Sequence, residues 1–175
     1  GDGDGVAETF NVKEFGAPDY FNLLINDTHA TKDTFQNTTT LSVSGTMTVT
    51  GGTYDAGSTA TAVTGLITVN GGLFSATSNQ QLFYGGLTVS SGTFTGGGST
   101  VFVGATSGNF LLSGGIFNAP SILNIYRDFN HSGGTFNAGS GTVSFTGGAS
   151  IQNIYGDTTF NNFSVSGIGG ITLAF

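Results

Sequence analysis

The feature that most constrains the fold is a Gly-Gly-x-aromatic motif, with serine in the first place in one copy, that recurs at nearly fixed spacing. The aromatic residues of its five copies are Tyr54, Phe74, Phe94, Phe117 and Phe136, so successive steps are 20, 20, 23 and 19 residues. A period in this range is typical of a solenoid, in which each repeat forms one coil stacked on the previous one.

A strand-like run precedes each motif. Met47-Thr48-Val49-Thr50 aligns with Ile67-Thr68-Val69-Asn70 and with Leu87-Thr88-Val89-Ser90. Apolar residues in the first and third places indicate a strand with one buried face. The glycine pair favours a sharp corner, because glycine adopts positive φ without steric cost, and the five aromatic rings are expected to turn inward and stack as a ladder. The chain is therefore predicted to be all-β: a parallel β-helix of about six coils with a period near 20 residues, preceded by an N-terminal segment that contains strands.

The distribution of charge divides the chain into two parts. Seven of the ten acidic residues fall within the first 33 positions: Asp2, Asp4, Glu8, Glu14, Asp19, Asp27 and Asp33. We therefore distinguish an acidic N-terminal segment, residues 1–40, from a β-solenoid body, residues 41–175. The strands of the acidic segment are predicted to form a junction with another subunit.

Composition narrows the classes of partner. The net charge of −7 disfavours nucleic acid and anionic membrane surfaces. The sequence contains no run of 18 apolar residues, the length needed to span a bilayer, so membrane insertion is not expected. Only 7% of the residues are charged, and there is no cysteine. A weakly charged body rich in Ser, Thr and Asn is typical of secreted β-rich surface proteins, so an extracellular or cell-surface location is expected.

Two later segments resemble a known class of protein. They are Phe136-Asn137-Ala138-Gly139-Ser140-Gly141-Thr142-Val143-Ser144-Phe145 and Thr158-Thr159-Phe160-Asn161-Asn162-Phe163-Ser164-Val165. They look like the strand repeats of large bacterial cell-surface and adhesin-like proteins, in the style of autotransporter passengers and filamentous haemagglutinins. The resemblance covers about residues 41–165 and implies a right-handed parallel β-helix on the cell exterior, with a structural or adhesive role.

No catalytic constellation is apparent, and the protein is expected not to be an enzyme. Asp55, Asp128 and Asp157 occupy different positions within their coils, whereas glycan-cleaving sites need carboxylates that converge. His131 takes the place of valine or leucine in other repeats and is predicted to be a core histidine. No cofactor is expected. Asp2 and Asp4, in a Gly-Asp-Gly-Asp-Gly run, are weak candidates for Ca²⁺, but two carboxylates supply too few of the oxygens that this ion needs.

The two ends of the chain resemble each other, and this similarity predicts self-assembly. Tyr20-Phe21-Asn22-Leu23-Leu24-Ile25 is similar to Phe160-Asn161-Asn162-Phe163-Ser164-Val165, so the last coil is expected to be a register copy of the first. Exposed strand edges favour strand addition. The predicted assembly residues are Tyr20, Phe21, Leu23, Ile25, Phe163, Val165, Ile171, Leu173 and Phe175. The expected partner is a second copy, joined head to tail into a filament or surface fibre.

Three other functions stay open at this point. An adhesin that binds surface glycans is the main alternative. Ice binding is suggested by the column Thr48, Thr68 and Thr88, which breaks at Leu111 and Asn130. Action on polysaccharides is the third, because parallel β-helices also host such enzymes.

Overall fold

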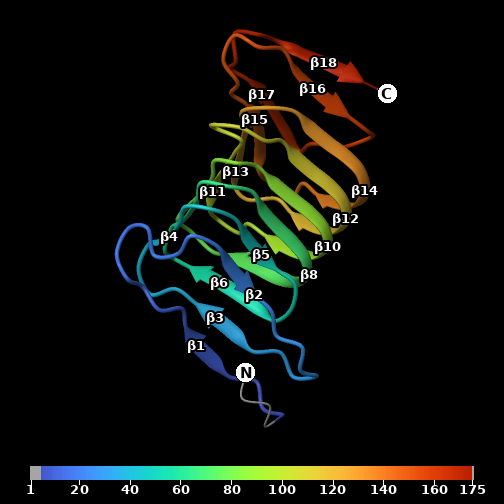
Figure 1. The fold of residues 1–175 in the computed structure, drawn as a ribbon. Helices are drawn as coiled ribbons and strands as arrows, with labels where there is room; N and C mark the ends of the chain where they lie inside the picture. The colour runs from blue at the N-terminus through green and yellow to red at the C-terminus, as the bar shows by residue number, and fades with distance from the viewer. Residues whose placement is uncertain (1–4, 175) are drawn as a thin grey trace.

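The chain winds into a β-solenoid. The computed structural model describes residues 5–174, and within them there are 18 strands and no helix. Successive coils stack in parallel along one axis, so the two ends of the chain lie at opposite ends of the molecule (Figure 1). The predicted period near 20 residues is confirmed, and the solenoid has about eight turns.

The strands stack in three columns. Column 1 contains β2 (Leu23–Ile25), β5 (Met47–Val49), the first halves of β8 (Ile67–Ala76), β10 (Leu87–Thr95), β12 (Phe110–Asn118) and β14 (Phe129–Asn137), then β16 (Gln152–Tyr155) and β18 (Ile171–Ala174). Column 2 contains β1 (Thr9–Asn11), β3 (Thr34–Gln36), β6 (Thr53–Gly57) and the second halves of β8, β10, β12 and β14. Together these two columns form an 11-stranded sheet.

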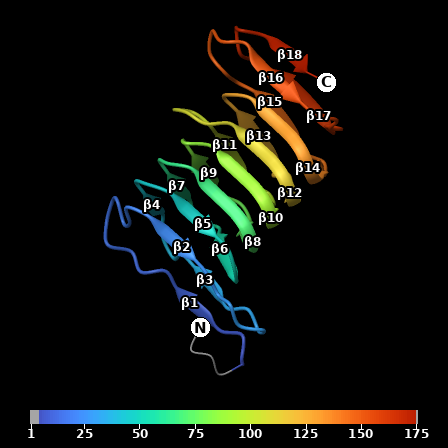
Figure 2. The same ribbon diagram turned by 45° about the vertical axis from the view of Figure 1, so that its right-hand side comes forward.

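Column 3 forms a separate 7-stranded sheet. It contains β4 (Leu41–Val43), β7 (Thr61–Val63), β9 (Gln80–Phe83), β11 (Thr100–Val103), β13 (Ile122–Ile125), β15 (Thr142–Phe145) and β17 (Asn162–Val165). Every pairing in both sheets is parallel, and Figure 2 shows the strands as successive rungs of one stack. Strand alternation places one set of side chains between the two sheets, where the apolar core lies.

The aromatic residues of the repeated motif lie in the core in register. Tyr54, Phe74, Phe94 and Phe117 have no exposed surface. The Phe94 and Phe117 rings lie 4.9 Å apart with an interplanar angle of 8°. A second ladder, which the motif did not predict, pairs Phe110 with Phe129 at 4.7 Å and 1°. Two parallel ladders of rings thus fill the middle of the core.

Glycine at the corner between columns 1 and 2 allows the coils to approach closely. Gly115 has a φ of +67°, in the region that other residues rarely adopt. A Cβ added at Gly115 would lie 2.5 Å from the carbonyl oxygen of Gly92 in the coil below. Both the backbone conformation and the close packing therefore require glycine.

The solenoid is longer than the six coils predicted from the motif. β1 and β3 continue column 2 below β6, with Phe10 paired to Phe35 and Phe35 paired to Tyr54. The strands of residues 1–40 that the structure describes thus pair within their own chain, as its first coils. In these coils Glu8 and Asp33, in place of glycine, precede the Thr-aromatic pairs, so the glycine motif missed them.

Candidate functional site

At the C-terminal end of the described residues, inward-facing side chains of the last strands are exposed. Leu173, Phe163 and Val165 are 58%, 49% and 44% exposed. They stand in register over the buried residues Ile154, Val143 and Phe145. The residues that the repeat places in the core are therefore open to solvent at this end.

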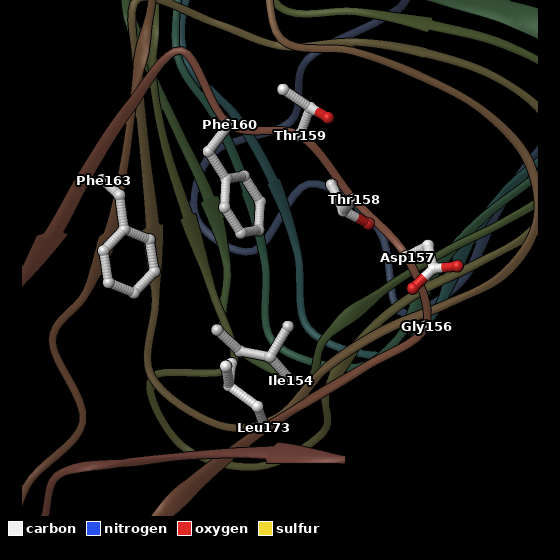
Figure 3. Close-up of a pocket in the computed structure, with 8 residues that line it drawn as sticks. All are labelled: Ile154, Gly156, Asp157, Thr158, Thr159, Phe160, Phe163 and Leu173. Carbon is white, nitrogen blue, oxygen red and sulfur yellow. The ribbon is translucent and has the colours of Figure 1, made fainter. Parts of the chain in front are cut away.

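A hollow of about 500 Å³ lies at this end (Figure 3). Phe160 and Phe163 border one side of it, Ile154 and Leu173 border another, and Asp157 lies near Thr158 (Figure 3). The hollow exists because column 2 has no strand above β14: after β16 the chain runs through residues 156–161 directly to β17.

Phe160 partly covers the ladders where column 2 ends. Its ring meets Phe129 at 5.3 Å and Phe136 at 5.7 Å, both edge-on. Phe136 still stacks on Phe117, at 5.5 Å and 13°, but it is only partly buried. The predicted ladder therefore runs from Tyr54 to Phe136, and its last ring is less protected than the others.

His131 differs from the predicted core histidine. It pairs in register with the buried Leu112, but it is only partly buried itself. Its Nδ1 lies 2.8 Å from the Thr158 hydroxyl. The reason is that residues 156–161 leave column 2 open, so that the imidazole meets a hydroxyl instead of another apolar layer.

At the N-terminal end, acidic side chains accept hydrogen bonds from backbone N–H groups. The buried carboxylate of Asp27 accepts from the N–H of Asp33 at 2.7 Å and from the N–H of His29 at 3.0 Å. These bonds, together with the His29 ring, lower the pKa of Asp27 to about 2. The N–H of Glu8 donates to Asp33, which lowers the pKa of that carboxyl and ties the chain before β1 to the next coil.

Glu14 and Asp19 act in the same way. The hydroxyl and N–H of Thr39 donate to Glu14 and lower its pKa. Burial acts to raise the pKa of Asp19, but the backbone N–H groups of Ser42, Phe15 and Gly16 together lower it. Glu14, Asp19 and Asp33 therefore connect neighbouring coils, whereas Asp27 holds the loop between β2 and β3, and the sequence predicted neither role.

The predicted assembly residues divide between the two ends. Tyr20 and Leu23 are partly buried and Ile25 is buried, whereas Phe21 is 74% exposed. At the other end Phe163, Val165 and Leu173 are exposed and Ile171 is partly buried. Phe175 lies outside the described residues.

The similar segments at the two ends are not register copies. Tyr20 bridges Val43 in column 3, whereas Leu23–Ile25 pairs with β5 in column 1. Residues 162–165 all belong to β17 in column 3. The first segment therefore turns a corner that the second does not, so this prediction was wrong.

The three carboxylates outside the N-terminal segment do not form a cluster. Asp55 is in β6, Asp128 follows β13 and accepts from the N–H of Asn153, and Asp157 follows β16. Between residues 5 and 174, no group of three or more His, Cys, Asp or Glu side chains is placed to hold a metal ion. The calcium candidates Asp2 and Asp4 lie outside the described residues.

The outer face carries ordered columns of polar side chains. Thr48, Thr68 and Thr88 are in register in column 1, as predicted. A longer set in column 2 was not predicted from the sequence: Thr9, Thr34, Thr53, Leu73, Thr93, Ile116 and Thr135. Two apolar residues interrupt this set, so neither column is threonine along its whole length.

These features define the class of the protein: it is a β-solenoid repeat protein. No family model, curated protein or solved structure matches the chain. Within the described part of the chain, no helix is long and apolar enough to cross a membrane.

Proposed function

We propose that the protein is a structural subunit of an extracellular filament or surface fibre, in which copies stack head to tail. The observation that carries the proposal is the exposure of Leu173, Phe163 and Val165 in core positions at the C-terminal end. An uncovered solenoid end exposes both apolar side chains and unpaired backbone groups. Another solenoid end satisfies both, because it continues the sheets and the core together.

The joined surfaces are different, since one is the first coil and the other the last. Such a contact does not close on itself, so it builds an open fibre. The low content of charged residues, 7%, is typical of secreted β-rich surface proteins and supports a location outside the cell.

The test compares variants at the end with variants on the side. Val165→Lys with Leu173→Lys puts two charges on the exposed end. The control, Ile116→Lys with Ile122→Lys, changes two side chains that are 41% and 42% exposed on the flanks. We expect the wild type and the control to form fibres in negative-stain microscopy and to sediment as concentration-dependent polymers. The end variant should keep the β-rich circular dichroism spectrum but remain monomeric.

Two results would contradict the proposal. One is a wild-type protein that stays monomeric at high concentration. The other is an end variant that polymerises as well as the flank control does, because the contact would then lie elsewhere on the molecule.

One observation favours a second function, the binding of surface glycans. The Phe102 and Tyr126 rings lie 6.5 Å apart on the outer face of column 3. Their neighbours in the chain, Val101 and Ile125, point into the core, so these two side chains point outward. Partly exposed aromatic rings of this kind suit stacking against sugar rings. Binding to a glycan array that Phe102→Ala and Tyr126→Ala abolish, with fibre formation unchanged, would support this function.

A further inference from the structure

The two ends of the solenoid are uneven in complementary ways. At the N-terminal end, column 2 begins with β1, one coil below the start of column 1 at β2. Column 3 also reaches that lower level, through the bridge of Tyr20 to Val43. Among the described residues, the first coil thus has strand pairing in columns 2 and 3 but none in column 1.

The C-terminal end has the opposite shape. β18 pairs with β16 and carries column 1 one level beyond β17, the last strand of column 3. Column 2 ended earlier, at β14. Within residues 5–174, the last level thus has a strand only in column 1, the column in which the described part of the first coil has none.

We propose that one coil at the junction is composite, with β18 supplied by one copy and β1 and the Tyr20 segment supplied by the next. This inference rests on the proposed head-to-tail stacking and specifies its register. In the joined filament, β2 of the next copy lies on β18, so column 1 continues without a gap.

The register gives a definite contact in column 1. Successive core partners are Leu23, Met47, Ile67, Leu87, Phe110, Phe129, Ile154 and Leu173. Leu173 is 58% exposed and Leu23 is partly buried. At the composite coil, Leu173 therefore meets Leu23 of the next copy, and an apolar contact repeats the pattern found inside the chain.

Column 3 gives a second contact. Its core partners are Tyr20, Val43, Val63, Phe83, Val103, Ile125, Phe145 and Val165. Val165 is 44% exposed. It therefore meets Tyr20 of the next copy.

Column 2 gives a third contact, across the hollow. Phe160 lies over Phe136 at the C-terminal end, while Phe10 begins the same column at the N-terminal end and stacks on Phe35 at 5.9 Å. Phe10 of the next copy thus faces Phe160 and covers the hollow. Each of the three columns contributes one apolar pair to the junction.

Disulfide cross-linking tests the register. The protein has no cysteine, so introduced thiols have no native competitors. Adjacent strands lie about 4.8 Å apart, within the Cα separation that a disulfide bridges. Leu23→Cys with Leu173→Cys should therefore give, on oxidation, a ladder of covalent multimers that returns to monomer on reduction.

The matched control is Leu23→Cys with Ile171→Cys, in which Ile171 precedes Leu173 by two residues within β18. Two residues along a strand add about 6.6 Å, which places the Cα atoms beyond about 7 Å and out of disulfide range. This pair should give little multimer under the same conditions. A second pair, Tyr20→Cys with Val165→Cys, tests column 3 and stands in if a column 1 variant folds poorly.

The outcomes separate the register from the stacking. Multimers from both predicted pairs but not from the offset pair would support the composite coil. Fibres in which neither predicted pair cross-links, or in which the offset pair cross-links equally, would overturn this register and leave head-to-tail stacking intact. An absence of both fibres and cross-links would overturn the composite coil together with the proposed function.

Discussion

The ring of Phe160 meets the ring of Phe136 edge-on, with centroids 5.7 Å apart and an interplanar angle of 87°. The rings below are nearly parallel, such as Phe94 and Phe117 at 8°. The change of geometry marks the point at which the chain leaves column 2. Because Phe136 is less buried at this point than Phe94 in the middle of the ladder, the two rings should contribute differently to the stability of the fold.

The first prediction compares two of these rings. Phe94→Ala removes a fully buried side chain in the middle of the ladder and should cost about 3–5 kcal/mol of unfolding free energy. Phe136→Ala removes a partly buried ring and should cost less, about 1.5–3 kcal/mol. Chemical denaturation of both variants measures the difference. Equal losses would mean that the C-terminal end is covered in the same way as the middle.

The second prediction concerns glycine at the corner. Gly115→Ala should destabilise the protein by more than Gly139→Ala. Both positions have positive φ, +67° and +56°, which costs alanine about 1–2 kcal/mol. A Cβ at Gly139 has no atom within 4 Å, whereas one at Gly115 would meet Gly92. Thermal unfolding of the two variants checks this order, and a reversed order would show that the coils are not in close contact here.

The third prediction is a loss of stability in acid. The folded-state pKa of Asp27 is about 2, below its ordinary value of 3.8, so its ionised form stabilises the fold at neutral pH. This contribution is present above about pH 4 and is lost as the pH falls through 2. Asp27→Asn should therefore lower Tm at pH 7, and its difference from the wild type should shrink toward pH 2.

Asp157→Asn is the control for this experiment, because it removes one negative charge at the opposite end of the solenoid. Its Tm should stay close to that of the wild type at pH 7. Curves of Tm against pH that run parallel for the wild type and Asp27→Asn would show that Asp27 does not carry the acid sensitivity.

The fourth prediction is that the protein cleaves no polysaccharide. Asp55 and Asp128 lie about three coils apart, or roughly 14 Å at the spacing of adjacent strands, whereas glycan hydrolysis needs carboxyl groups about 5–9.5 Å apart. Assays with plant, bacterial and animal polysaccharides should detect no products. Activity that a single change of Asp55, Asp128 or Asp157 to Asn abolishes would require a different account of the protein.

The fold could be predicted from the sequence because the Gly-Gly-x-aromatic motif marks two things at once: its glycines mark a corner of the coil, and its aromatic residue marks a core position. In Thr93-Phe94, for example, the first residue faces out and the second faces in. The same Thr-aromatic pair occurs at Thr9-Phe10 and Thr34-Phe35, and it would have revealed the first coils. Glycine does not precede the pair there. Instead, Asp27 accepts from the N–H of Asp33 within one loop, and Asp33 accepts from the N–H of Glu8 in the coil below.

The candidate site was harder to predict. The apolar residues at both ends could be named, but their columns could not, because only the three-dimensional path shows that the chain turns a corner between Tyr20 and Leu23. The direct path from Gly156 to Asn161 likewise has no sequence signature. This stretch differs from the earlier coils in that it forms no column 2 strand above Phe136.

The parallel register of the coils has a mechanical consequence. Inter-strand hydrogen bonds run along the axis of the solenoid, so a pull on the two ends of the chain peels the coils away one after another, starting from the ends. A coil of 20 residues, such as the one between Phe74 and Phe94, extends to at most about 66–72 Å when unwound, against a rise of about 4.8 Å when folded. Under tension the molecule would lengthen in steps, each coil releasing more than ten times its folded height.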